Sequence, residues 1–165
     1  MFPSPLAREA SRLLEALRAM RLKLVAAESC TGGLIASLFT EIPGASDVFE
    51  RGFVTYSNAS KEECLGVPAA LLAEHGAVSE AVARAMAEGA LAHSRADIAV
   101  AVTGLAGPGG GSAGKPIGLV YVAAARKGGA TLHRECRFGA IGRGEIRLRA
   151  VEAALDLVRQ IIGQP

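Results

Sequence analysis

The segment of residues 97–103, DIAVAVT, is the feature that most constrains how this 165-residue chain folds. It is a nearly continuous apolar run of strand length, which is typical of a central strand covered on both faces of a sheet. Half of the chain is apolar, with few aromatic residues and no Trp. We therefore expect a core of Ala, Val, Leu and Ile packed on both sides of this strand.

Periodicity and turn signals divide the chain into short elements. Strands are predicted at residues 22–27, 53–57, 97–103, 117–125 and 131–138. Helices are predicted at residues 5–20, 34–40, 59–65, 80–93 and 145–162, with another helical turn starting at Pro68. Pro5 suits the first turn of its helix, and Ser79 is a plausible N-cap.

The connections between these elements predict the topology. Strands alternate with helices in the first half of the chain, which gives parallel crossovers. The connections before and after residues 117–125 leave no room for a helix, and Lys127, Gly128 and Gly129 form a hairpin turn. We expect one α/β domain over residues 1–165, a three-layer α/β/α sandwich with a mixed five-stranded sheet and one antiparallel strand.

Composition excludes several classes of protein. A net charge of +2 gives no reason to expect a nucleic-acid partner, and no apolar run approaches the roughly 20 residues of a membrane span. The first 20 residues mix Arg and Glu with Leu and Ala, unlike a signal peptide. The three cysteines lack CxxC spacing, and the three histidines lack metal-ligand spacing. These features favour a cytoplasmic protein with reduced thiols and no metal site.

The turn of residues 29–33, SCTGG, lies between a predicted strand and a predicted helix. Free N–H groups at the start of that helix, with Gly32 and Gly33 allowing close approach, would form an anion pocket. A plain N-cap with a tight turn explains the same residues equally well. Cys30 is a possible nucleophile at this position, but a buried structural cysteine is the stronger interpretation.

The glycine-rich segment of residues 104–115 partly matches two phosphate-binding motifs. Gly109, Gly114 and Lys115 fit GxxxxGK, and Gly109, Gly111 and Gly114 fit GxGxxG. Both motifs require a helix next, whereas Pro116 and an apolar strand follow here. The segment is better interpreted as the flexible wall of a pocket that opens at Thr103 and Gly104.

Two groups of polar and charged residues can be interpreted either as parts of a functional site or as ordinary solvated surface. Tyr56, Asn58 and Lys61 cluster where the second strand ends, and Lys61 is either a site residue or a solvated lysine at a helix start. Arg143 and Arg147 are four residues apart at the start of the last helix, so their guanidinium groups point to one side. They would hold a phosphate or carboxylate, or belong to a solvated basic face.

Five ordered blocks resemble one family. They are residues 27–33 (AESCTGG), 54–58 (VTYSN) with Lys61, 76–79 (GAVS), 103–108 (TGLAGP) and 115–118 (KPIG). Together they resemble the C-terminal domain of the competence/damage-inducible protein CinA, from about Leu6 to Ile162. Stand-alone members of that family are nicotinamide-nucleotide amidases. Since no molybdopterin-binding-like domain precedes these blocks, we expect the stand-alone form.

The resemblance implies the same three-layer fold and a reaction. Nicotinamide mononucleotide would be hydrolysed to nicotinic acid mononucleotide and ammonia, which recycles pyridine nucleotides, without a cofactor. Ser46 matches the family's nucleophile, Lys61 its base, and Tyr56 the group that helps to move the proton. Ser29 and Thr103 match positions that line the amide, and the expected substrate-binding residues also include Thr31, Gly32, Gly33, Asn58, Gly104 and Arg143.

Two points stay open from the residues themselves. Spacing does not choose between Ser46 and Ser29 as nucleophile, and only the resemblance favours Ser46. The chain also has Ile141, Gly142 and Arg143 where the family usually carries Gly-Asp-Arg, so the orientation of Arg143 is not set by the resemblance.

The expected partner is a small nucleotide substrate, and the Ala-rich surface of residues 81–92 suggests a homodimer or a higher homo-oligomer. One alternative is a non-catalytic module that binds a nucleotide or a partner protein in competence or DNA-damage pathways. Another is a magnesium-dependent nucleotidase, which would depend on the weak match of the glycine-rich segment.

Overall fold

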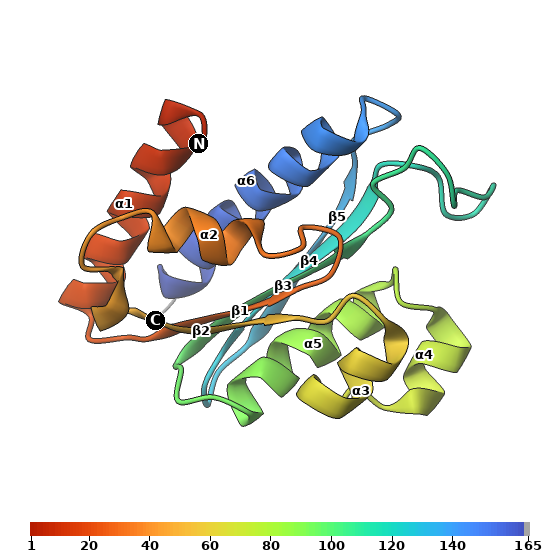
Figure 1. Cartoon of the computed structure of the whole chain (residues 1–165). Helices are drawn as coiled ribbons and strands as arrows, with labels where there is room; N and C mark the ends of the chain where they lie inside the picture. The colour runs from red at the N-terminus through yellow and green to blue at the C-terminus, as the bar shows by residue number, and fades with distance from the viewer. Residues whose placement is uncertain (164–165) are drawn as a thin grey trace.

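The computed structural model describes residues 1–163, which form one sheet flanked by helices (Figure 1). The strands, in their order across the sheet, are β2 (Phe49–Val54), β1 (Leu24–Glu28), β3 (Ile98–Gly104), β4 (Leu119–Arg126) and β5 (Thr131–Arg137). The α-helices are α1 (Ser4–Ala19), α2 (Leu34–Thr40), α3 (Asn58–Leu65), α4 (Ala69–His75), α5 (Glu80–Ala92) and α6 (Arg143–Ile162). A short 3₁₀ helix, η1 (Ala45–Asp47), precedes β2.

The sheet is mixed, as predicted. β1 pairs in parallel with β2 and β3, whereas β4 pairs antiparallel with β3 and with β5. Within residues 1–163, β4 is thus the one strand that runs against the others. The reason is the one given by the sequence: the connections on either side of β4 are too short to carry a crossover helix. β3 lies at the centre and is buried along almost its whole length.

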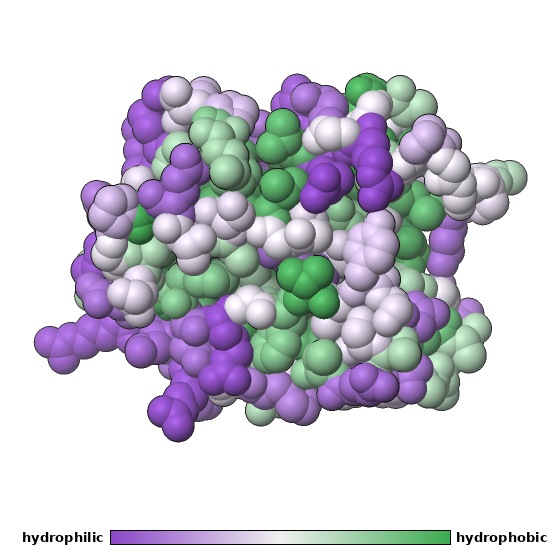
Figure 2. All heavy atoms as spheres, in the orientation of Figure 1, coloured by the Kyte–Doolittle hydropathy of each residue, from purple (hydrophilic) through white to green (hydrophobic). Residues whose placement is uncertain are grey.

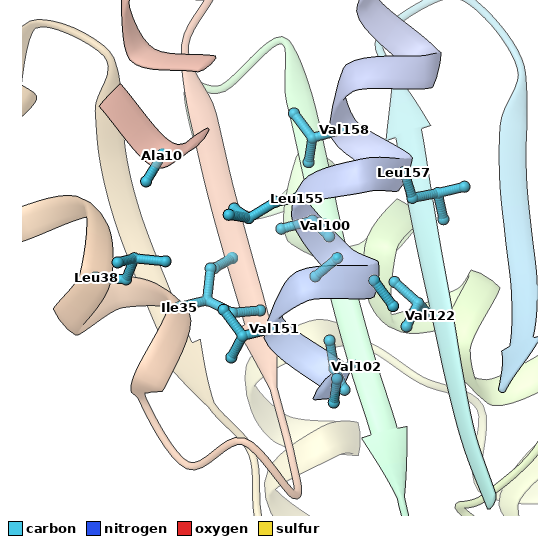
Figure 3. Packing of buried hydrophobic residues seen from close by; sticks show 14 of the residues in the cluster. Ala10, Ile35, Leu38, Val100, Val102, Val122, Val151, Leu155, Leu157 and Val158 are labelled. Atoms are coloured by element: carbon cyan, nitrogen blue, oxygen red, sulfur yellow. The ribbon is translucent and has the colours of Figure 1, made fainter. Parts of the chain in front are cut away.

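Helices cover both faces of the sheet, which confirms the three-layer α/β/α architecture. Figure 1 shows α1, α2 and α6 on one face and α3, α4 and α5 on the other. Alternate residues of β3 serve the two layers: Val100 packs in the core beneath α6, and Ala101 packs in the core beneath α5. Figure 3 shows Val151 and Leu155 of α6 packed beside Ile35 and Val100. Burial of such aliphatic side chains stabilises the fold by about 1.5–3 kcal/mol each.

The largest error in the predicted elements concerns β2, which was expected at residues 53–57. It starts four residues earlier, at Phe49, and ends at Val54. Glu50 and Arg51 concealed the strand because a charged pair is unusual in a buried strand. β2 is an edge strand, however, and these two side chains pair with each other at 2.7 Å, with Arg51 exposed to solvent.

The Ala-rich surface of α5 packs within this chain. Ala83, Met86, Ala87 and Ala90 are fully buried against the sheet and neighbouring helices. This packing removes most of the surface on which the expectation of self-association was based. Gly89 explains how α3 approaches α5 so closely, because a Cβ atom at that position would lie 2.0 Å from the Leu65 carbonyl oxygen.

Polar and apolar residues alternate over the face of the molecule that Figure 2 shows, where hydrophobic residues form several small patches that hydrophilic residues separate. Large hydrophobic side chains that are exposed include Val54 and Tyr56, at and just beyond the end of β2. Among the helices of residues 1–163, none combines the length and the apolar character that crossing a membrane requires.

Candidate active site

The candidate site lies where the carboxyl ends of three parallel strands meet. β1 ends at Glu28, β2 at Val54 and β3 at Gly104. Because parallel strands place their carboxyl ends at one edge of the sheet, the loops that follow them come together there. The turn that starts at Ser29, the segment from Thr55 to Ser57 and the glycine-rich loop therefore adjoin, although they are far apart in the sequence.

A cavity of about 240 Å³ opens between these loops. Its lining includes six of the residues expected at the site: Ser29, Tyr56, Lys61, Thr103, Gly104 and Arg143. Further lining residues are Cys30, Ala77, Val78, Leu105, Ala106, Gly107 and Gly109. The glycine-rich loop thus forms a wall of the pocket, as predicted, and it leads into β4 rather than into the helix that a phosphate-binding motif requires.

Lys61 and Ser29 form the central contact of the cavity. The Nζ atom of Lys61 lies 3.0 Å from Ser29 Oγ and donates to the Thr55 carbonyl oxygen at 2.6 Å. Lys61 is only 1% exposed, and its burial lowers the pKa of the amine below the usual value for lysine. A buried amine with a lowered pKa beside a hydroxyl is the arrangement that general-base activation of serine requires.

Local sequence explains why Lys61 points inward. Ser57 caps the N-terminus of α3 by accepting from Ser60 N, and the Ser60 hydroxyl oxygen accepts from Ser57 N in return. This capping box fixes where α3 starts. Lys61 and Leu65, one helical turn apart, then face the protein interior. The alternative interpretation, that Lys61 is a solvated lysine at a helix start, is therefore wrong.

Tyr56 and Arg143 meet at the rim of the cavity. One guanidinium nitrogen of Arg143 donates to Tyr56 Oη at 2.9 Å, and the other donates to the Gly107 carbonyl oxygen at 2.8 Å. Tyr56 is 63% exposed, so the pair is accessible to a ligand. Arg143 is the first residue of α6, two residues before the predicted start of that helix.

Thr103 and Gly104 shape the back of the cavity. The Thr103 hydroxyl donates to the Ala77 carbonyl oxygen at 2.8 Å, which ties β3 to the connection between α4 and α5. Gly104 allows β4 to approach, because a Cβ atom there would lie 2.6 Å from a methyl group of Val120. Ala77 and Val78 had not been expected at the site. They belong to a distinctive sequence block, but small apolar residues give no chemical signal by themselves.

The expectation of an anion pocket at the start of α2 is wrong, because a side chain of the protein already binds the N–H groups there. The carboxylate of Glu28 accepts from Ile35 N at 2.9 Å and from Ala36 N at 3.1 Å, and Glu28 is fully buried. The N–H groups of Ile35 and Ala36 at this helix start are therefore already paired with a side chain of the protein itself. The alternative, a plain N-cap with a tight turn, holds only for the turn: the N-cap residue is Gly33, which makes no side-chain cap, and Glu28 at the end of β1 accepts from the helix N–H groups instead.

Four expected substrate-binding residues do not line the cavity. Gly32 and Gly33 adopt positive φ angles of 56° and 96°, which lets the chain turn from β1 into α2. Thr31 is fully buried, and its carbonyl oxygen accepts from Arg147. Asn58 is exposed at the first position of α3. Gly32 and Gly33 therefore shape the turn into α2, and none of the four residues belongs to the cavity lining.

Ser46 requires a larger correction. It is exposed in η1, before β2, in a hollow lined by Pro43, Phe49 and Arg51 among others. Lys61 lies beyond the opposite end of β2, and a strand of six residues spans roughly 17–20 Å. Figure 1 shows the segment that leads into β2, where η1 lies, and α3 at opposite ends of β2. The expected pairing of Ser46 with Lys61 is therefore wrong, because Lys61 cannot take a proton from Ser46 directly.

Cys30 lines the cavity beside Ser29 but is a poor nucleophile. Burial raises the pKa of its thiol to about 12, although the nearby Arg147 acts in the opposite direction. At neutral pH such a thiol carries almost no thiolate. The interpretation of Cys30 as a buried structural cysteine is the one that the structure favours.

Comparison with known proteins agrees with the fold. The family model described as the CinA C-terminal domain matches residues 6–162. The chain belongs to the CinA C-terminal domain family. Within this family, the competence/damage inducible protein CihA from Agrobacterium tumefaciens has a solved structure with 51% sequence identity and a TM-score of 0.96, covering 99% of both chains.

Other members of the CinA family are more distant or longer. A CinA superfamily protein from Klebsiella pneumoniae is 34% identical, with a TM-score of 0.90 over 96% of this chain and 98% of that one. A CinA-like protein of Akkermansia muciniphila is 61% identical over 110 residues, which cover 67% of this chain and 27% of that protein. The chain spans about a third of the length of the curated relatives it matches.

Proposed function

We propose that this CinA domain hydrolyses the carboxamide of nicotinamide mononucleotide, with Ser29 as the nucleophile and Lys61 as the base. The observation that carries the proposal is the 3.0 Å contact between Ser29 Oγ and a lysine amine that is 1% exposed. Family membership supplies the expected substrate, and the geometry replaces Ser46 by Ser29. The latter was the alternative that sequence spacing had left open.

The first step forms an acyl-enzyme. Neutral Lys61 takes the proton of the Ser29 hydroxyl while Ser29 Oγ attacks the carboxamide carbon. The carbonyl oxygen becomes an oxyanion, which needs N–H or O–H donors. The hydroxyl of Thr103 already donates to Ala77. We therefore assign the oxyanion to the backbone N–H of Cys30, which directly follows Ser29 and lines the same cavity.

Release of ammonia requires a proton on the leaving nitrogen. The C–N bond breaks as this proton arrives, either from Lys61 in its ammonium form or through the hydroxyl of Tyr56. The Tyr56 oxygen accepts its hydrogen bond from Arg143. Its own O–H is therefore left to donate to the leaving nitrogen, which fits the expected role of Tyr56.

Hydrolysis of the acyl-enzyme then completes the cycle. Lys61 takes a proton from water, the resulting hydroxide attacks the ester carbon, and the C–O bond to Ser29 breaks. Ser29 Oγ takes its proton from the Lys61 ammonium group, which returns the amine to its neutral form, and nicotinic acid mononucleotide leaves. These steps balance without a metal ion or a redox group. Arg143, at the accessible rim, suits the phosphate of the substrate, which would compete for the guanidinium with Tyr56 and Gly107.

The experiment is incubation of the purified chain with nicotinamide mononucleotide, with ammonia measured enzymatically and the product identified by mass spectrometry. We expect equal amounts of ammonia and nicotinic acid mononucleotide. Lys61→Met is the matched control, since it keeps a long side chain but removes the amine. A parallel sample with a chelator should retain full activity.

Each alternative has its own result. Binding of the nucleotide without release of ammonia would favour a non-catalytic module. Release of phosphate that a chelator abolishes would favour the nucleotidase. Either result would overturn the amidase proposal.

A further inference from the structure

The first two turns of α6 reach both sides of the cavity. Arg143 contacts the glycine-rich loop and Tyr56, as described above. Arg147, one turn later, points to the turn that carries Ser29. Its Nε atom donates to the Cys30 carbonyl oxygen at 3.0 Å, and its Nη2 atom donates to the Thr31 carbonyl oxygen at 3.0 Å.

We propose that Arg147 is a positioning residue, which holds the Ser29 turn so that Ser29 Oγ stays within reach of Lys61 Nζ. This inference rests on the proposed function, because it concerns the same nucleophile and base. Arg147 does not line the cavity, so it acts through Ser29 and not on the substrate. Both arginines had been expected to bind one anion. In the structure they have separate places: Arg143 lines the cavity, and Arg147 contacts the turn that forms its wall.

Apart from Arg147, the backbone of the Ser29 turn is held by one hydrogen bond to β3 and by two hydrogen bonds of its own. In the latter, Gly32 N donates to the Ser29 carbonyl oxygen at 3.0 Å, and Leu34 N donates to the Thr31 carbonyl oxygen at 3.1 Å. Ser29 N donates to the Val102 carbonyl oxygen at 2.9 Å, which anchors the residue to β3. The next residues leave the sheet, and Gly32 has a positive φ angle. A planar guanidinium that binds two consecutive carbonyl groups fixes both peptide planes at once. A Cβ atom on Gly32 would lie 3.3 Å from Nη2, so the guanidinium also fits closely over the turn.

The guanidinium is delivered by a rigid element. Val151, one turn after Arg147, is fully buried, and Figure 3 shows it packed beside Ile35 of α2. The helix that follows the Ser29 turn therefore packs on the helix that carries Arg147. A side chain on a packed helix holds a catalytic group more accurately than one on a loop.

The test compares Arg147→Met and Arg147→Lys with Arg149→Met. Methionine keeps an apolar stem, lysine keeps the charge but cannot bind both carbonyl groups, and Arg149 is an exposed arginine of the same helix that pairs with Glu145 and Glu152. Activity on nicotinamide mononucleotide gives kcat and KM. Labelling by a serine-directed fluorophosphonate, in which Ser29 Oγ displaces fluoride and gives up its proton, reports the reactivity of Ser29 without the substrate. Thermal melting reports folding.

Misplacement of a reacting group by about 1 Å costs about 100-fold in rate. We therefore expect Arg147→Met to lower kcat by about 100-fold and to slow labelling similarly, with KM within about threefold of wild type. For Arg147→Lys, kcat and the labelling rate should lie between those of wild type and Arg147→Met, and Arg149→Met should behave as wild type. The pH midpoint of kcat/KM should not move, because the guanidinium contacts carbonyl groups and not the amine of Lys61.

Unchanged turnover and labelling in both Arg147 variants would overturn the inference. A rise in KM at constant kcat would do so too, since Arg147 would then bind substrate, and a shifted pH midpoint would indicate an electrostatic role instead. If Arg147→Met does not fold, Arg147→Lys decides by the same measurements. If the wild-type protein releases no ammonia, the proposed function fails, whereas slower Ser29 labelling in the variants still supports the positioning role.

Discussion

Ser29 and Lys61 are 32 residues apart in the chain, yet the Oγ atom of one lies 3.0 Å from the Nζ atom of the other. β1 delivers the serine, and the helix after β2 delivers the lysine. The contact exists because β1 and β2 are adjacent and parallel, so that both side chains reach the same edge of the sheet. Because of this contact, the hydroxyl group that has the Lys61 amine beside it is that of Ser29.

The nucleophile assignment predicts opposite results for two serines. Ser29→Ala should lower kcat by at least about 10³-fold, as removal of an activated serine does in other hydrolases. Ser46→Ala should stay within about threefold of wild type, because Ser46 lies beyond the other end of β2. Steady-state kinetics on both variants gives the comparison. Wild-type rates in Ser29→Ala, or a comparable loss in Ser46→Ala, would contradict the assignment.

The proposed role of Lys61 as the base predicts how the reaction rate depends on pH. The base must be neutral, and burial lowers its pKa below the value of about 10.4 for an exposed lysine. kcat/KM should therefore rise with pH and level off, with its midpoint below about 10.4. Lys61→Arg should be inactive at every pH, since a guanidinium stays protonated. A wild-type profile that is flat from acid to alkaline pH would argue against an amine base.

Cys30 should be unreactive although it adjoins the proposed nucleophile, Ser29. Its thiol pKa of about 12 leaves almost no thiolate near neutral pH, whereas Cys64 is exposed. Brief treatment with iodoacetamide at pH 7.5, followed by peptide mass spectrometry, should therefore find the label on Cys64. Cys30→Ala should keep turnover within about threefold. Rapid alkylation of Cys30, with loss of activity, would identify it as the nucleophile instead.

Two glycines on helices should respond differently to alanine. At Gly89 a methyl group would lie 2.0 Å from the Leu65 carbonyl oxygen, so Gly89→Ala should destabilise the fold by about 1–3 kcal/mol. Gly144 is also helical, with no atom near the position of a Cβ among the described residues. Gly144→Ala should leave the free energy of unfolding unchanged or raise it by up to about 1 kcal/mol, because alanine has a higher helix propensity than glycine. Urea unfolding measures both, and equal effects would show that α3 does not pack tightly on α5.

Much of the fold was predictable from local pattern. The apolar run of β3, the cap at Ser79 and the hairpin after β4 each depend on neighbouring residues, and each lies where the sequence predicted it. β2 was misplaced because an edge strand tolerates charged residues, here Glu50 and Arg51. A polar edge strand carries little periodic signal, and its pairing with β1 defines it instead.

The sequence by itself determined the kinds of residue at the site and the loops that carry them. Ser29 and Tyr56 follow strands, Thr103 lies near the end of a strand, and Lys61 and Arg143 lie in the first turn of a helix. Such ends can be located from local pattern. Only the tertiary structure decided which of them are in contact. The contact of Lys61 with Ser29, the capping of α2 by Glu28 and the hydrogen bonds of Arg147 to the Ser29 turn depend on distances between residues that are not adjacent in the chain. No local preference encodes those distances, because they are set by strand order and by the packing of α2 and α6.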